Sequence, residues 1–178
     1  MKKEAKFFFD LGIRYLLLIV AAIPNLWIFY FIFTPLTVYP VYFLSKMFSS
    51  SFLFENTIVF SGSLIQIIPA CIAGSAYYLL LILNLSTPKI KIKKRIIMLG
   101  IAFLSFLILN IIRIFALTIL FLSGSPLFDI THKLFWYILS IVFVVGIWFV
   151  EVKRFKIKEI PFYSDIKSLY NLSSFKRG

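Results

Sequence analysis

The sequence predicts an all-helical polytopic membrane protein, and three observations support this class. Apolar residues make up 61% of the 178 residues and only 15% are charged, which is far from the composition of a soluble domain. Several apolar runs reach the ~20 residues that a helix needs to cross the hydrocarbon core. The basic residues are concentrated in the segments that flank these runs.

The distribution of positive charge indicates the orientation of the chain. All but three of the 19 basic residues lie within residues 2–14, in the loop at 89–95, or after residue 152. This is the positive-inside pattern, so the net charge of +12 does not imply binding to nucleic acid. We expect no nucleic-acid partner, a multi-pass protein of the cell membrane, and cytoplasmic N- and C-termini.

We expect one transmembrane domain over residues 1–150, followed by a basic cytoplasmic tail over residues 151–178 that is either interfacial or loose. The predicted spans are about residues 12–33, 69–85, 96–122 and 133–150. The first apolar run is too long for a signal-peptide core and has no small-residue cleavage site. It is therefore predicted to be an uncleaved span.

The segment between the first two spans is expected to stay outside the membrane core. Pro35–Phe48 is short, contains two prolines and Lys46, and is predicted to be a helix in the outer interface, because the loop at 88–95 must be cytoplasmic. Two β-prone runs follow, at 56–60 and 64–68, around a turn signal at Ser61-Gly62-Ser63. They predict an extracytoplasmic β-hairpin. Alternatively, 64–68 begins the next helix.

Cys71, the only cysteine, lies at the predicted start of the second span. Pro69 fits the first helical position, so Cys71 falls in the first turn, where the helix dipole favours a thiolate. A lone cysteine in an apolar segment is more often an inert packing residue. A single cysteine excludes an intrachain disulfide and a cysteine-based metal site, and we expect no metal or cofactor. Gly74 begins a patch of small residues where a helix or substrate can approach closely.

Two polar residues interrupt the third span. Asn110 and Arg113 are three residues apart and therefore share a helical face. Arg113 lies ~26 Å from the cytoplasmic end of the span, near the outer edge of the hydrocarbon. Such an arginine tends to face the protein interior and to mark a functional site. The alternative is an arginine that snorkels to the outer headgroups, which would not explain Asn110.

His132, the only histidine, opens the fourth span, and Asp129 lies three residues earlier, where it can orient the imidazole. An isolated histidine here is most simply a partly solvated interfacial residue. However, Cys71 lies ~22 Å above the cytoplasmic end of its span, at the level of Arg113 and His132. A thiolate, an imidazole and a cation suit acyl transfer, with Asn110 as a further oxyanion donor or supporting residue.

These residues, in this order and spacing, resemble the exosortase/archaeosortase family over about residues 50–150. The run Asn56–Gly74 resembles the approach to the family's cysteine. Asn110-Ile-Ile-Arg113-Ile114 resembles its Asn-x-x-Arg-Ile motif, and His132 resembles its third invariant position. The compact chain is most similar to small archaeal members. It departs from the family's usual Cys-Ser-Gly or Cys-Thr-Gly, because Cys71 is followed by Ile72, Ala73 and Gly74.

The resemblance implies a membrane cysteine transpeptidase that acts on secreted proteins. Their C-terminal sorting signal consists of a short motif, a transmembrane helix and a basic tail. The enzyme cleaves near the motif and transfers the new C-terminus to a lipid or another surface acceptor. Cys71 would be the nucleophile, Arg113 the stabilising cation and His132 the acid/base, on the extracytoplasmic side.

Two alternatives stay open. One is a non-catalytic membrane subunit or small transporter component, in which Arg113 and Asn110 bind an anion or a partner helix. The other is an intramembrane protease that only hydrolyses its substrate, since hydrolysis and transfer share the thioacyl step.

Overall fold

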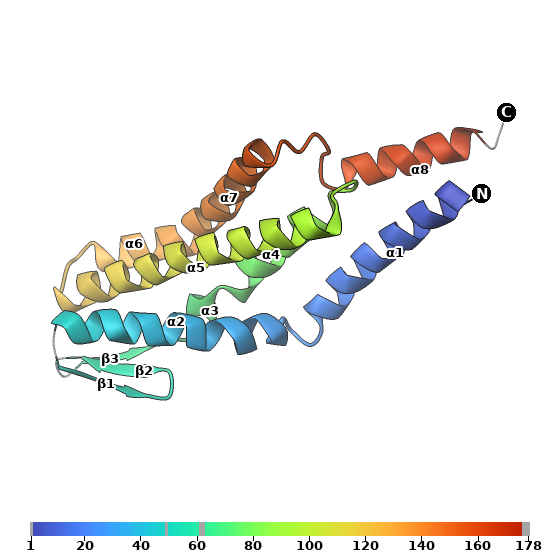
Figure 1. Ribbon diagram of the computed structural model, residues 1–178. Helices are drawn as coiled ribbons and strands as arrows, with labels where there is room; N and C mark the ends of the chain where they lie inside the picture. Colours follow the sequence, from blue (N-terminus) through green and yellow to red (C-terminus); the bar gives the residue numbers. More distant parts are fainter. Residues whose placement is uncertain (1, 49, 61–62, 176–178) are drawn as a thin grey trace.

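The computed structural model describes residues 2–48, 50–60 and 63–175, and it is mostly helical with one small antiparallel sheet (Figure 1). The helices are α1 Lys2–Ala22, α2 Trp27–Phe48, α3 Pro69–Ile72, α4 Gly74–Leu85, α5 Ile92–Leu122, α6 Phe128–Leu134, α7 Ser140–Arg154 and α8 Tyr163–Phe175. A π turn, η1 Phe135–Leu139, joins α6 to α7. The strands are β1 Ser51–Phe54, β2 Thr57–Phe60 and β3 Ser63–Gln66.

Three helical segments are long and apolar enough to cross a membrane, which suggests a multi-pass membrane protein. They are α2, α5 and the continuous run Phe128–Arg154 formed by α6, η1 and α7. The run Pro69–Leu85 is apolar but shorter. Many large apolar side chains on these helices are exposed, as expected for surfaces that face lipid.

The bounds of the predicted first span, residues 12–33, are wrong. Helix α1 ends at Ala22, and α2 begins at Trp27. Between them the Ile23–Pro24 peptide is cis, and Asn25 and Leu26 have positive φ. Proline has no N–H to donate to the preceding turn, and here the helix ends before it.

The prediction of a separate helix at 35–48 is also wrong, because these residues form the second half of α2, which is long and apolar enough to cross a membrane. Pro35 and Pro40 both lie inside this 22-residue helix. Each proline removes one backbone hydrogen bond, a loss that transmembrane helices tolerate where neighbouring elements pack around them. Helix α2 packs along α5, α4 and β1.

The predicted hairpin belongs to a three-stranded antiparallel sheet in the order β1-β2-β3. Strands β2 and β3 pair with Ile58 opposite Ile65, which confirms the two predicted strands and excludes a helix at 64–68. The predicted turn at Ser61 and Gly62 lies outside the described residues. Strand β1 was not predicted, because Phe52-Leu53-Phe54 shows no alternation of polar and apolar residues.

Aromatic side chains form the centre of the helical core and fix α4 between α2 and α5. Phe33 of α2 stacks on Tyr77 of α4 with ring centroids 3.6 Å apart. Phe103 and Phe106 of α5 meet the Tyr77 ring edge-on. Tyr77 is fully buried by these contacts.

The C-terminal tail is not loose, since α8 is attached to the opposite end of the molecule from the sheet (Figure 1). Asp165 accepts hydrogen bonds from both terminal nitrogens of Arg14, at 2.9 and 2.7 Å. Arg14 also donates to the Leu85 carbonyl at 2.9 Å. The Phe162 N–H donates to the Ser86 carbonyl, so α1, α4 and α8 meet at one point.

Candidate functional site

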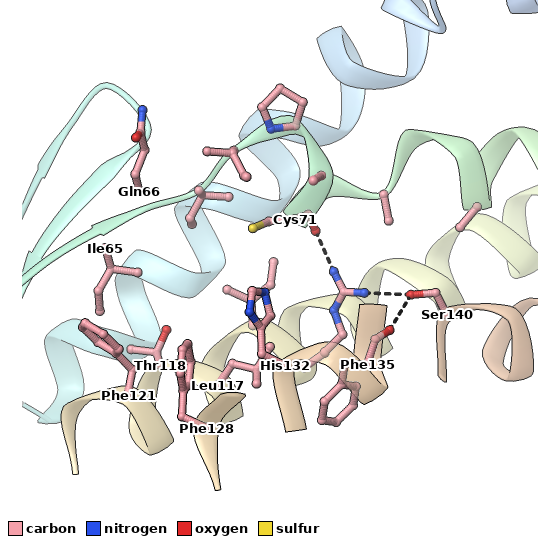
Figure 2. Close-up of a pocket in the computed structure, with 18 of the residues that line it drawn as sticks. Ile65, Gln66, Cys71, Leu117, Thr118, Phe121, Phe128, His132, Phe135 and Ser140 are labelled. Carbon is pink, nitrogen blue, oxygen red and sulfur yellow. Dashed lines mark hydrogen bonds between the residues drawn. The ribbon is translucent and has the colours of Figure 1, made fainter. Parts of the chain in front are cut away.

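A cavity of about 530 Å³, which we call the site cavity, lies between β3, α3, α5 and α6. Its lining includes Cys71, Arg113 and His132, which come from α3, α5 and α6 respectively. Figure 2 shows the Cys71 sulfur and the His132 imidazole facing into this space. The structure therefore brings together the three residues that were placed at one level by counting along the helices.

Cys71 lies in a four-residue helix rather than at the start of a long one. Pro69 takes the first helical position, as expected, but Ala73 adopts φ 59° and ψ 48°, and α4 starts again at Gly74. The Cys71 N–H donates to the Ile68 carbonyl at 2.8 Å. The argument from unpaired N–H groups and a long helix dipole is therefore wrong, because the N–H is bonded and α3 ends one residue later.

Because the helix breaks at Ala73, the carbonyls of Cys71 and Ile72 accept hydrogen bonds from side chains of α5. Asn110 Nδ2 donates to the Cys71 carbonyl at 3.0 Å and lies 3.4 Å from the Ile72 carbonyl. Arg113 Nη2 donates to the Cys71 carbonyl at 3.1 Å. The shared face of Asn110 and Arg113 thus holds the backbone of the cysteine turn. Both side chains are buried, so Arg113 faces the interior and does not snorkel.

A second contact of Arg113 involves Ser140, a residue that sequence reasoning missed. Arg113 Nη1 donates to Ser140 Oγ at 2.9 Å, and Ser140 Oγ donates to the Phe135 carbonyl at 3.0 Å. His132 and Ser140 both line the site cavity, and the π turn η1 lies between them. A spacing of eight residues is ordinary for one face of a helix, so it does not single out Ser140.

The Arg113 charge has no carboxylate partner within the described residues. Its Nε and the Asn110 Oδ1 are buried and also lack a hydrogen-bond partner there. A buried cation without a counter-ion favours an anion nearby, such as a thiolate or an oxyanion. The guanidinium therefore gives the site cavity a positive end beside Cys71.

The two remaining predicted site residues, Asp129 and Gly74, differ in whether the structure places them near the site cavity. Asp129 is exposed on α6 and does not line the site cavity, so the structure does not bring it to the site. At Gly74 a Cβ would lie 2.8 Å from the ring of Tyr30. The close approach expected at this glycine is therefore made by α2, whose Tyr30 also lines the site cavity.

His132 is half-buried, and its ring stacks on Phe128 with centroids 5.5 Å apart. This contact fixes the imidazole on the α6 wall of the site cavity. Among residues 2–48, 50–60 and 63–175, no group of three or more His, Cys, Asp or Glu side chains is placed to hold a metal ion.

The chain was compared with protein-family models, with curated proteins and with solved structures, and none of the three comparisons gave a match. Its function must therefore be inferred from the site.

Proposed function

We propose that this protein is a membrane cysteine peptidase of the transpeptidase type, acting on a C-terminal sorting signal of secreted proteins. One observation carries the proposal: a single cavity is lined by the only thiol, the only imidazole and a buried guanidinium that has no carboxylate partner among the described residues. In thiol-based acyl transfer these groups can serve as the nucleophile, the acid/base and the stabilising charge for the oxyanion.

The reaction begins when the Cys71 thiolate attacks a peptide carbonyl carbon. A C–S bond forms, the carbonyl oxygen becomes an oxyanion, and the Arg113 charge stabilises it. The oxyanion collapses, the C–N bond breaks, and His132 gives a proton to the departing amine. The resulting thioester is attacked by an acceptor, which loses its proton to His132 as Cys71 leaves as thiolate.

Asn110 acts as a positioning residue in this scheme. Its Nδ2 is occupied by the Cys71 and Ile72 carbonyls, so it does not serve as an oxyanion donor. Arg113 has two tasks, because one terminal nitrogen holds the Cys71 carbonyl while its charge acts on the reacting atoms. The alternative of a non-catalytic subunit has less support, since it gives no role to the thiol and the imidazole that line the same cavity.

The conformation of Ala73 supports the exosortase/archaeosortase resemblance. That family's pattern has glycine two residues after the cysteine, and Ala73 occupies this position here. Its φ of 59° lies in the left-handed region, where glycine is favoured over other residues. The motif glycine and Ala73 would therefore serve the same break between two helices.

The arrangement of charge supports an extracytoplasmic site. The elements that line the site cavity include β3 and α6, which lie at the end of the molecule away from α1 and α8 (Figure 1). The basic segments are concentrated toward the other end, which the positive-inside rule assigns to the cytoplasm. A secreted protein and a membrane lipid acceptor would both reach the site cavity from outside.

The proposal is tested by co-expressing the protein with a secreted reporter that ends in a short motif, a transmembrane helix and a basic tail. Cys71→Ala and His132→Ala should abolish processing, while Ser123→Ala in the exposed outer loop should leave it unchanged. The mass of the new C-terminus separates transfer from hydrolysis, since an acceptor adds its own mass and water leaves a free carboxylate. Processing that continues in Cys71→Ala would overturn the mechanism.

A further inference from the structure

Strand β3 has a free edge beside the site cavity. The Ile67 N–H donates to the Asn56 carbonyl at 2.8 Å, which extends the ladder between β2 and β3 by one pair. The backbone groups of alternate residues point to opposite edges of a strand, so those of Leu64 and Gln66 point away from β2. Within the described residues, β3 pairs with another strand on the β2 side only.

The site cavity borders this edge rather than one face of the sheet. Five consecutive residues, from 64 to 68, line it. Their side chains alternate, since Ile67 is buried whereas Leu64 is 70% exposed. Figure 2 shows Ile65 pointing toward Thr118 and Phe121 while Gln66 points the other way. A sheet face presents only every second residue, so an unbroken run of five indicates the strand edge.

We propose that the substrate binds as an extended strand added to the free edge of β3, pairing with the backbone N–H and C=O groups of Leu64 and Gln66. This inference rests on the proposed function and specifies how the substrate is held. Strand addition is a general way for a sheet edge to bind a peptide of variable sequence. A free strand edge beside a reactive site offers the backbone partners that such a peptide needs.

The same edge leads to the proposed nucleophile. Ile68 follows Gln66 by two residues, ~7 Å along an extended chain, and its carbonyl accepts the Cys71 N–H. A peptide paired with Leu64 and Gln66 therefore presents a bond about two residues further on to the thiol.

Alternation also defines which substrate side chains matter. Every second side chain of the added strand would face the same side as Ile65. The wall on that side is apolar and includes Leu117, Phe121 and Phe128. The structure thus assigns an apolar subsite to a substrate residue that lies within three positions of the cleaved bond.

The test uses peptidyl chloromethyl ketones as probes of binding. The parent probe is acetyl-Ala-Leu-Ala-Ala chloromethyl ketone, and its relatives are N-methylated at one backbone amide each. Alkylation rates are measured by intact mass on the full-length protein in detergent and divided by the rate with chloroacetamide. Peptide mapping locates the adduct, because a chloromethyl ketone can alkylate the His132 imidazole as well as the Cys71 thiol, and only the Cys71 adduct is counted.

Strand addition predicts that N-methylation slows labelling at every second backbone amide of the probe. Methylation at amides that face β3 should slow labelling about five- to tenfold, the factor that one ordinary hydrogen bond supplies. Methylation at the intervening amides should have little effect. Equal rates for the whole series, or a loss at every position, would overturn the proposal.

A matched pair of variants tests the protein side. The backbone N–H of Gln66 points away from β2, so Gln66→Pro removes this N–H without breaking a hydrogen bond to β2. Gln66→Ala keeps the N–H. Only Gln66→Pro should lower the ratio of the peptidyl-probe rate to the chloroacetamide rate, again about five- to tenfold. Equal rates for the two variants would contradict strand addition. If the proline variant also reacts abnormally with chloroacetamide, the methylation series on the unmodified protein decides.

The labelling experiment is independent of turnover. If the reporter is never processed but the alternating pattern is present, the catalytic proposal fails and the binding mode stands. If processing requires Cys71 but the pattern is absent, the binding mode fails alone.

Discussion

Arg113 donates a hydrogen bond from Nη2 to the backbone carbonyl of Cys71 at 3.1 Å, which ties the middle of α5 to the turn that carries the thiol. The same guanidinium reaches Ser140 through Nη1. One side chain therefore connects three walls of the site cavity. This geometry makes Arg113 a structural element of the site as well as its positive charge.

Arg113→Lys should lower both the stability of the protein and reporter processing, although it keeps the positive charge. A lysine ammonium lacks the planar fork that reaches the Cys71 carbonyl and Ser140 Oγ together. Losing one buried hydrogen bond to a charged group costs about 1.5–3 kcal/mol of unfolding free energy. Tryptophan fluorescence on heating in detergent measures this loss, and reporter processing should fall with it. Arg154→Lys, at an exposed position, is the control, and equal behaviour of the two variants would refute this role.

Ala73→Gly should stabilise the protein. The left-handed conformation costs a residue with a Cβ about 1–2 kcal/mol, and part of this gain is offset by the greater freedom of glycine in the unfolded chain. We expect a net gain of about 0.5–1 kcal/mol. Ala116→Gly, inside α5, is the matched control and should instead destabilise by about 1 kcal/mol. A loss of stability in both variants would show that the break at Ala73 does not favour glycine.

Part of the site followed from sequence because helical rise converts residue number into depth. Counting along three apolar helices placed Cys71, Arg113 and His132 at one level, and the site cavity contains all three. The break at Ala73 could not be predicted from the sequence, since the residue at that position is neither glycine nor proline. Ser140 was missed because its spacing from His132 is ordinary for a helix and nothing else in the sequence singles it out.

The first fifty residues show that part of the fold could not be predicted from the sequence either. Pro24 and Pro35 are both prolines in apolar surroundings, yet the chain bends at the first and continues as helix through the second. Proline removes one backbone donor in either case, and the packing of neighbouring elements decides whether the helix ends. A sequence pattern contains no information on that packing.

Gly74→Ala should destabilise the contact between α2 and α4. The new methyl group would lie 2.8 Å from the Tyr30 ring, and relieving this overlap costs about 1–3 kcal/mol. Gly100→Ala, where no atom lies within 4 Å of an added Cβ, should stabilise its helix by up to ~1 kcal/mol. Tyr30→Leu in the Gly74→Ala chain should restore part of the loss. If the two glycine variants have the same thermal stability, α2 does not approach α4 as described.

Asp165→Asn should release α8 from the end of the molecule that lies away from the sheet. The substitution leaves Arg14 buried without a full counter-charge, and breaking such a pair costs about 3–5 kcal/mol. Limited proteolysis after α7 measures the release.

The exposed pair between Lys89 and Glu159 is the control, because it should contribute less than ~1 kcal/mol. The hydrogen bond from Lys89 lowers the pKa of Glu159, so this small contribution is lost as the pH falls through the folded-state pKa. Equal proteolysis of Asp165→Asn and Glu159→Gln would contradict the role of the buried pair.

The central claim is that Cys71 carries the acyl group, and an acid quench during reporter processing tests it most directly. Intact mass and peptide mapping should find the N-terminal part of the reporter attached to Cys71 through a bond that hydroxylamine cleaves, as it does a thioester. The adduct should be absent in Cys71→Ser. An acyl adduct on another residue, or full processing by Cys71→Ser, would contradict the account.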